Sequence, residues 1–198
     1  MRIFLLVLFA AAAANAGAQV AYPVKPIRLI VTFTPGGTAD LLGRTLGQEL
    51  AQRTGQTVVV DNKAGAGGVL GSDLAAKAAP DGYTLVLSNA ASHASATAIN
   101  KYMPYDPERD FAHIGVVCVM PQTFVVPRDF PANTLEGFVA EAKRAPGKLN
   151  FGTAGIGSMG HFAGELMKVS AGIDMRHVPY KGTAPANIDL IANRVQAM

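Results

Sequence analysis

The sequence predicts an α/β protein whose mostly parallel strands are covered by helices. Short apolar runs alternate with segments in which leucine recurs every four residues, the spacing of one helix face. Loops rich in glycine, proline and other turn-forming residues separate the two kinds of segment. This alternation of strand and helix is typical of parallel sheets with helices on both faces.

The alternation begins after residue 26. Leu42, Leu46 and Leu50 lie on one face of the first expected helix, and Gly55 ends that helix. A second helix is expected around Leu70. The strands expected in this part of the chain are residues 27–33, 57–60 and 84–88.

The middle of the chain interrupts this pattern. Residues 100–110 are polar and contain prolines, which indicates a loop. Two further strands are expected at residues 113–120 and 123–126, on either side of Pro121, where we expect the chain to cross between lobes.

Strand and helix then alternate again. Asn133 and Glu136 resemble a capping box and predict the start of a helix that ends near Pro146. Strands are expected at residues 149–152 and 175–178, each followed by a helix. Residues 194–198 have the pattern of another strand that is just beginning.

The N-terminus has the three parts of an export signal. Met1-Arg2 is a basic start, residues 3–9 are apolar, and residues 10–18 are small and contain small-x-small cleavage sites. The apolar part is shorter than the roughly 20 residues of a membrane span, and an uncleaved anchor is the alternative. We expect residues 1–18 to be a signal peptide and the mature protein to be periplasmic.

Composition argues against several kinds of partner. The formal charge is +3, without a basic run and without tryptophan to stack on bases, so nucleic acid is not expected. The four histidines lack metal-ligand spacing, and we expect neither a metal nor a cofactor. Cys118 is the single cysteine and lies in an apolar run, where we expect it to be buried.

Four loops share one design, in which a strand ends, small residues follow and a helix begins. They are residues 35–40, 62–68, 88–93 and 153–161. Parallel sheets bind ligands at the carboxyl ends of their strands. Helix N-termini expose free N–H groups and the positive end of the helix dipole. Two facing N-termini could therefore hold a carboxylate without an arginine. The expected donors are the N–H groups of Gly36 to Ala39, those around Gly157, and the hydroxyls of Thr38, Thr153 and Ser158.

Several candidate residues have two interpretations. Asp40 either orients water or a ligand hydroxyl, or stabilises the N-terminus of its helix. Arg44 is expected on the surface or in a salt bridge, whereas His161 either reaches the ligand or is structural. Asn89, Ser92 and His93 are expected to form a polar wall of the site, although a structural role is the alternative.

Two enzyme classes fit the motifs less well. Residues 155–160 form a GxGxxG pattern after a strand, but no acidic residue ends the following strand, as dinucleotide binding would require. Ser158 with His161 allows a secreted hydrolase, but the spacing is one residue short of a GxSxG elbow.

A series of motifs then resembles a known family. They are Tyr22–Arg28, Pro35–Asp40, Asn62–Gly68, Pro80–Leu85, Tyr105–Pro107, Pro146–Leu149 and Val178–Pro185. Their order and combination resemble the Bug family, the periplasmic solute-binding proteins of tripartite tricarboxylate transporters. The resemblance covers nearly everything from residue 22 onward.

This resemblance implies a two-lobed type II periplasmic binding protein fold, in which each lobe is a mostly parallel sheet flanked by helices. The expected first lobe is residues 19–120, and the expected second lobe is residues 121–198. Family members are longer, so we expect a C-terminally truncated chain in which the second lobe and the return to the first are incomplete.

The resemblance also implies a function without chemistry. A monomer would capture a small carboxylate, such as a di- or tricarboxylate, between its lobes and deliver it to membrane transporter subunits. Presentation of the ligand to a membrane receptor, as a sensor, is the alternative. The family grips the carboxylate with loops that match residues 35–40 and 153–161. The full set of expected ligand-binding residues is Pro35, Gly36, Gly37, Thr38, Ala39, Asp40, Ser88, Asn89, Ser92, His93, Thr153, Gly155, Gly157, Ser158, His161 and Thr183.

Overall fold

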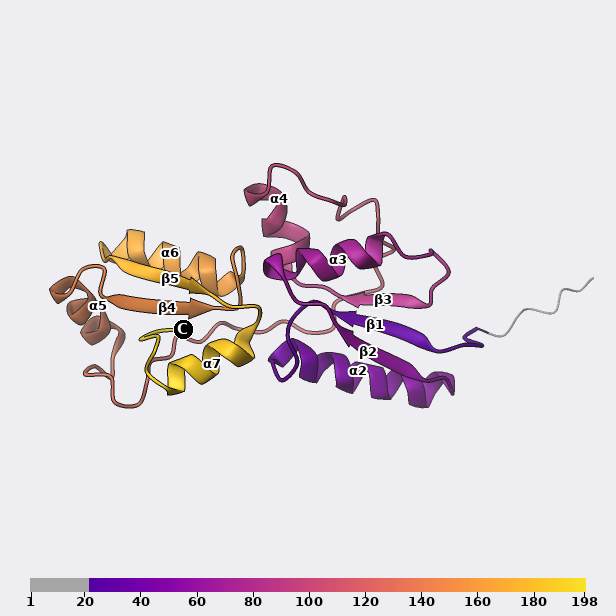
Figure 1. Cartoon of the computed structure of the whole chain (residues 1–198), viewed down its shortest axis with the longest axis horizontal. Helices are drawn as coiled ribbons and strands as arrows, with labels where there is room; N and C mark the ends of the chain where they lie inside the picture. Colours follow the sequence, from indigo (N-terminus) through magenta and orange to yellow (C-terminus); the bar gives the residue numbers. More distant parts are fainter. Residues whose placement is uncertain (1–21) are drawn as a thin grey trace, which may run out of the picture.

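The computed structural model describes residues 22–198, so the expected signal peptide at residues 1–18 lies outside the described residues. Two separate parallel sheets, each flanked by helices, lie side by side along the long axis of the molecule (Figure 1). The α/β prediction is therefore confirmed. We call the sheet β2-β1-β3 with its helices the first lobe, and the sheet β4-β5 with its helices the second lobe.

The first lobe is built around a central buried strand. Strand β1 (Ile27–Val31) lies between β2 (Val58–Asn62) and β3 (Thr84–Leu87), and both pairings are parallel. Val31 is in register with Asn62 on one side and Leu87 on the other. The three strands therefore end at the same edge of the sheet, where the loops that follow them gather.

Helices α2 (Thr38–Thr54) and α3 (Val69–Ala76) cover opposite faces of this sheet (Figure 1). Gly47 of α2 allows the helix to approach β2, because a Cβ there would lie 3.2 Å from Val60 Cγ2. Gly71 of α3 has the same role against the end of β1, since its Cβ would lie 3.0 Å from Thr32 Cγ2. The remaining elements are the short turns η1 (Ala66–Gly68) and η2 (Ala91–Ser95) and helix α4 (Ala96–Ile99).

The second lobe pairs β4 (Leu149–Thr153) with β5 (Met175–Pro179), also in parallel. Its helices are α5 (Leu135–Arg144), α6 (Met159–Ala171) and α7 (Thr183–Ile191). The core contains Phe138, Ala142, Phe151, Ile173, Met175 and Ala197. Ala197 forms an isolated parallel bridge with Phe151, so the strand expected in residues 194–198 is present only as this single bridge.

The strands predicted at residues 113–120 and 123–126 are wrong. The structure has no strand in either range, and the side chains of Ile114 and Val119 are 86% and 89% exposed. The apolar pattern there predicted burial, but a strand also needs a neighbouring strand with which to pair. Val125 does exchange two backbone hydrogen bonds with Met198.

Two smaller expectations are also corrected. Cys118 is exposed rather than buried, because it belongs to the same unpaired segment. The N-cap of α5 is Thr134 rather than Asn133, and its hydroxyl accepts a hydrogen bond from the Gly137 N–H at 3.1 Å. Within residues 22–198, no helix has the length and apolar character needed to cross a membrane.

Candidate functional site

The two lobes touch where their strands end. The Thr34 N–H donates to the Lys181 carbonyl at 3.3 Å, and the Ser95 hydroxyl donates to the Gly157 carbonyl at 3.0 Å. Both bonds join the first lobe to the second. We call this contact the interlobe seam, formed by residues 33–38, 65–68 and 95–99 of the first lobe with residues 155–158 and 180–184 of the second.

Asp40 holds the first loop in shape. It is only 5% exposed, and its Oδ2 accepts from the Gly36 N–H at 2.9 Å and from Arg44 Nε at 3.0 Å. Burial alone would raise the pKa of this carboxyl, but the hydrogen bonds from Arg44 and the Gly36 N–H outweigh burial and lower it. These contacts favour the helix-stabilising role of Asp40 and the salt-bridge role of Arg44. The Gly36 N–H is already hydrogen-bonded to Asp40.

The N-termini of α2 and α7 face each other across the interlobe seam. A Cβ at Gly37, the N-cap of α2, would lie 2.9 Å from Thr183 Oγ1 and 3.7 Å from the backbone nitrogen of Ala184. Gly182 is the N-cap of α7, and neither glycine supplies a side chain to satisfy the first N–H groups of its helix. Two positive helix ends therefore meet at one place, which favours a negatively charged ligand.

The second-lobe loop lies against a different part of the first lobe. A Cβ at Gly67 would lie 2.6 Å from the Ile156 carbonyl oxygen, and one at Gly155 would lie 3.6 Å from the Gly67 nitrogen. Gly157 is close to Ile99, whose Cδ1 would be 2.7 Å from a Cβ at that glycine. Residues 155–158 thus contact the 65–68 loop and the end of α4, while residues 35–37 contact the start of α7.

Ser158 is a helix cap. Its Oγ accepts from the His161 backbone N–H at 3.3 Å, as an N-cap serine does for α6. The His161 ring is turned elsewhere, because its Nδ1 accepts from the Gly157 N–H at 3.2 Å. No base activates the hydroxyl in this arrangement, so the geometry gives no support to the hydrolase alternative.

Thr153 and two histidines lie directly behind the same loop. Thr153 Oγ1 accepts from the Gly155 N–H at 3.2 Å and lies 2.7 Å from His177 Nε2. The rings of His161 and His177 are stacked with their centroids 4.2 Å apart. Burial, together with the nearby His161, lowers the pKa of His177 to about 4.

The low pKa of His177 predicts acid sensitivity of the second lobe. Between the ordinary histidine pKa of 6.5 and about pH 4, the imidazole is protonated in the unfolded chain but neutral in the folded chain. The free energy of unfolding therefore falls as the pH falls through that window. We expect His177→Gln to remove part of this loss in urea unfolding followed by circular dichroism. His113→Gln, at an exposed histidine of the first lobe, is the matched control and should retain the parent's pH dependence.

The loop after β3 is held by its own polar side chains. Asn89 donates from Nδ2 to Thr32 Oγ1 at 3.1 Å and accepts at Oδ1 from the Ala91 N–H at 2.7 Å. Ser92 is fully buried and donates to the Asn89 carbonyl at 3.2 Å. These contacts favour the structural interpretation of Asn89 and Ser92. The Ser88 side chain forms no hydrogen bond within residues 22–198.

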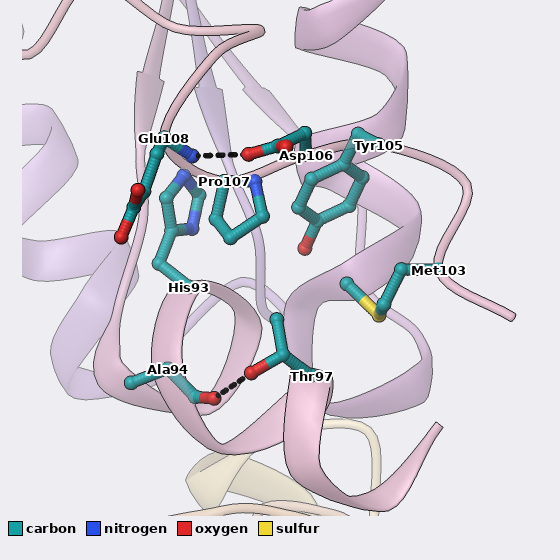
Figure 2. Close-up of a pocket in the computed structure, with 8 residues that line it drawn as sticks. All are labelled: His93, Ala94, Thr97, Met103, Tyr105, Asp106, Pro107 and Glu108. Atoms are coloured by element: carbon teal, nitrogen blue, oxygen red, sulfur yellow. Dashed lines mark hydrogen bonds between the residues drawn. The ribbon is translucent and has the colours of Figure 1, made fainter. Parts of the chain in front are cut away.

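His93 lies at a separate hollow on the first lobe. This open depression of about 610 Å³ is bordered by η2, α4 and residues 103–108 (Figure 2). His93 contacts Phe111 with ring centroids 4.7 Å apart, and Asp106 and Glu108 also line the hollow. Carboxylates at the rim disfavour an anionic ligand, and the hollow contains none of the other expected site residues. Among residues 22–198, no cluster of histidine, cysteine and acidic side chains is arranged for a metal.

Sequence reasoning did not place Thr34, Ser95 or Lys181 among the ligand-binding residues, although all three lie at the interlobe seam. Thr34 Oγ1 is also buried without a hydrogen-bond partner among the described residues. The position of Thr34 in the loop after β1, immediately before Pro35, is the one local signal that could have identified it. Ser95 and Lys181 are defined only by their contacts with the opposite lobe.

Comparison with known proteins places this geometry in a family. The profile described as "Tripartite tricarboxylate transporter family receptor", TctC, matches residues 42–198. BugT of Bordetella pertussis is 38% identical over 177 residues, which cover 89% of this chain and 54% of BugT. The chain spans about half the length of the curated relatives it matches.

Solved structures of related proteins show the same similarity. The chain is similar to R. palustris Rpa4515 with adipate, with a TM-score of 0.86 and 34% identity over 89% of this chain and 59% of that one. For MatC of Rhodopseudomonas palustris with bound malate, the TM-score is 0.84 and the sequence identity is 32%. This similarity covers 89% of this chain and 60% of MatC. For the periplasmic binding protein BugD, the TM-score is 0.82 and the sequence identity is 34%. The similarity covers 89% of this chain and 59% of BugD.

Proposed function

Because the chain belongs to the TctC family of tripartite tricarboxylate transporter receptors, we propose that it binds a small carboxylate at the interlobe seam. The bound acid would then be delivered to the membrane subunits of such a transporter. The protein performs no chemistry on its ligand in this account.

The opposed N-termini of α2 and α7 carry this proposal. Gly37 and Gly182 leave the first N–H groups of both helices without a side-chain cap, and Thr183 adds a hydroxyl at the same place. A carboxylate there would accept hydrogen bonds from both lobes at once. Binding would therefore favour the closed arrangement, because a ligand stabilises the state to which it binds better.

Dicarboxylates are the ligand class with most support. Two solved relatives are described with adipate and with malate. A second carboxylate of the ligand would extend along the interlobe seam toward residues 155–158, a loop that lies between Thr153 at the end of β4 and Ser158 at the N-cap of α6. The specific acid would be selected at that distal end.

The placement in the cell and the division into lobes are also proposed. Residues 1–18 would direct export to the periplasm, as expected for a relative of the periplasmic binding protein BugD. Residues 19–120 would form the first lobe and 121–198 the part of the second that this chain contains. The protein would act as a monomer.

Titration calorimetry of the 198-residue chain tests this function. Adipate and malate are the probes, and hexamethylenediamine, which has the carbon count of adipate but the opposite charge, is the control. We expect saturable heat from at least one diacid and none from the diamine. Binding of the diamine, or of neither acid, would contradict the proposal.

A further inference from the structure

The hydrogen bond between Gly157 and His161 depends on the charge of the imidazole. The Gly157 N–H donates to His161 Nδ1 at 3.2 Å. A nitrogen that accepts a hydrogen bond carries no proton, so the ring in this arrangement is neutral, with its hydrogen on Nε2. A proton added at Nδ1 would abolish the bond and leave the Gly157 N–H free.

The second histidine of the stack is a fixed neighbour. His177 is held by Thr153 Oγ1 at 2.7 Å and by stacking between His161 and Phe151, at centroid distances of 4.2 and 4.9 Å. Its lowered pKa of about 4 keeps it neutral across the range of about pH 5 to 8 in which histidines ordinarily change charge. His177 therefore takes up no net proton in that range.

The other charged groups near the stack largely offset each other. Glu165 and Lys168 are on α6, in the two turns after His161, and their side chains form an ion pair at 3.0 Å. Both act on the charge of His177, Glu165 by favouring its protonated form and Lys168 by opposing it. On the β4 side the stack meets Phe151 and Thr153, which carry no charge.

We propose that His161 is a positioning residue that couples carboxylate capture at the interlobe seam to the uptake of one proton. This inference rests on the proposed function. The proton comes from solvent and binds at Nδ1 of His161. The Gly157 N–H, in a loop that already contacts Ser95 and Ile99 across the seam, is then released toward the ligand. The new imidazolium also adds a positive charge beside an anionic ligand.

The coupling can be tested first without any ligand. In the isotope-labelled chain, the amide resonance of Gly157 should shift in one sigmoidal step as the pH is lowered, because a proton at Nδ1 of His161 removes the acceptor of its hydrogen bond. His161→Asn keeps an acceptor near the position of Nδ1 but cannot be protonated, so the step should vanish. His161→Gln is a second variant in case the first fails to fold. His113→Gln, at an exposed histidine outside the seam, should leave the step unchanged. A Gly157 amide that does not titrate, or that still titrates in both His161 variants, would overturn the proposal.

The consequence for binding is tested with adipate. Its affinity for the parent chain should rise as the pH falls from about 8 to 6, by at most about tenfold per pH unit, the limit for one coupled proton. His161→Asn should show a flat profile. A flat profile in the parent would overturn the proton coupling. Absence of binding to adipate and malate at every pH, with a normal Gly157 titration, would instead contradict the proposed function.

Discussion

Alanine in place of Gly67 is expected to separate the lobes and to weaken carboxylate binding by about tenfold to a hundredfold. Gly67 has a φ of +64°, and a Cβ there would lie 2.6 Å from the Ile156 carbonyl oxygen of the other lobe. An L-residue at this φ costs about 1–2 kcal/mol in any setting. The overlap adds about 1–3 kcal/mol, and it does so only when the lobes are closed. Each 1.4 kcal/mol corresponds to about a factor of ten in affinity.

Gly55→Ala is the matched control for this variant. Gly55 has nearly the same φ, +68°, but a Cβ there would have nothing within 4 Å. The two variants should lose similar stability from the backbone, whereas only Gly67→Ala should lose affinity for adipate. Small-angle X-ray scattering gives a readout without ligand, since only Gly67→Ala should increase the radius of gyration. Equal affinities and equal radii would show that residues 65–68 do not hold the lobes together.

Alanine in place of Phe138 is expected to destabilise the second lobe by about 3–5 kcal/mol, the range for a buried phenylalanine. Phe138 is 1% exposed and contacts Phe124 and Phe130 at centroid distances of 4.9 and 5.2 Å. The cavity would lie at the centre of the small core that joins α5 to β4 and β5. Urea unfolding followed by circular dichroism measures the loss.

Val169→Ala serves as the comparison in the same lobe. Val169 is on α6 and 80% exposed, so its truncation should change stability by no more than about 0.5 kcal/mol. The first lobe has its own sheet and should unfold at the parent's urea concentration in both variants. A Phe138→Ala chain within about 1 kcal/mol of the parent would mean that this core contributes little to folding.

The strands and helices that could be predicted from sequence are those with a complete local signal. Strand β1 is an apolar run that ends at Pro35-Gly36-Gly37, and α2 shows its leucines at helical spacing and ends at Gly55. Parallel pairing followed from the alternation alone. The unpaired segment around Ile114 shows the limit of this reasoning, because an apolar pattern predicts that a strand would be buried but does not supply its partner.

The site was predictable as a set of loops but not as a set of contacts. Glycine-rich strand ends marked residues 35–40 and 153–161, and both loops do lie at the interlobe seam or directly behind it. The contact between Thr34 and Lys181 joins residues far apart in sequence, and each is unremarkable in its own segment. Likewise, the spacing of Gly36 and Asp40 allowed a ligand role for the carboxylate until its hydrogen bond to the Gly36 N–H was known.

The central claim is that a carboxylate binds where α2 and α7 face each other. Adipate titrated into the isotope-labelled chain tests it residue by residue through the backbone amide resonances. The account predicts saturable shifts at Gly37, Thr38, Thr183 and Ala184, and none at Gly55, at the far end of α2. Shifts confined to the hollow around His93 and Glu108, with the two helix N-termini unchanged, would contradict it.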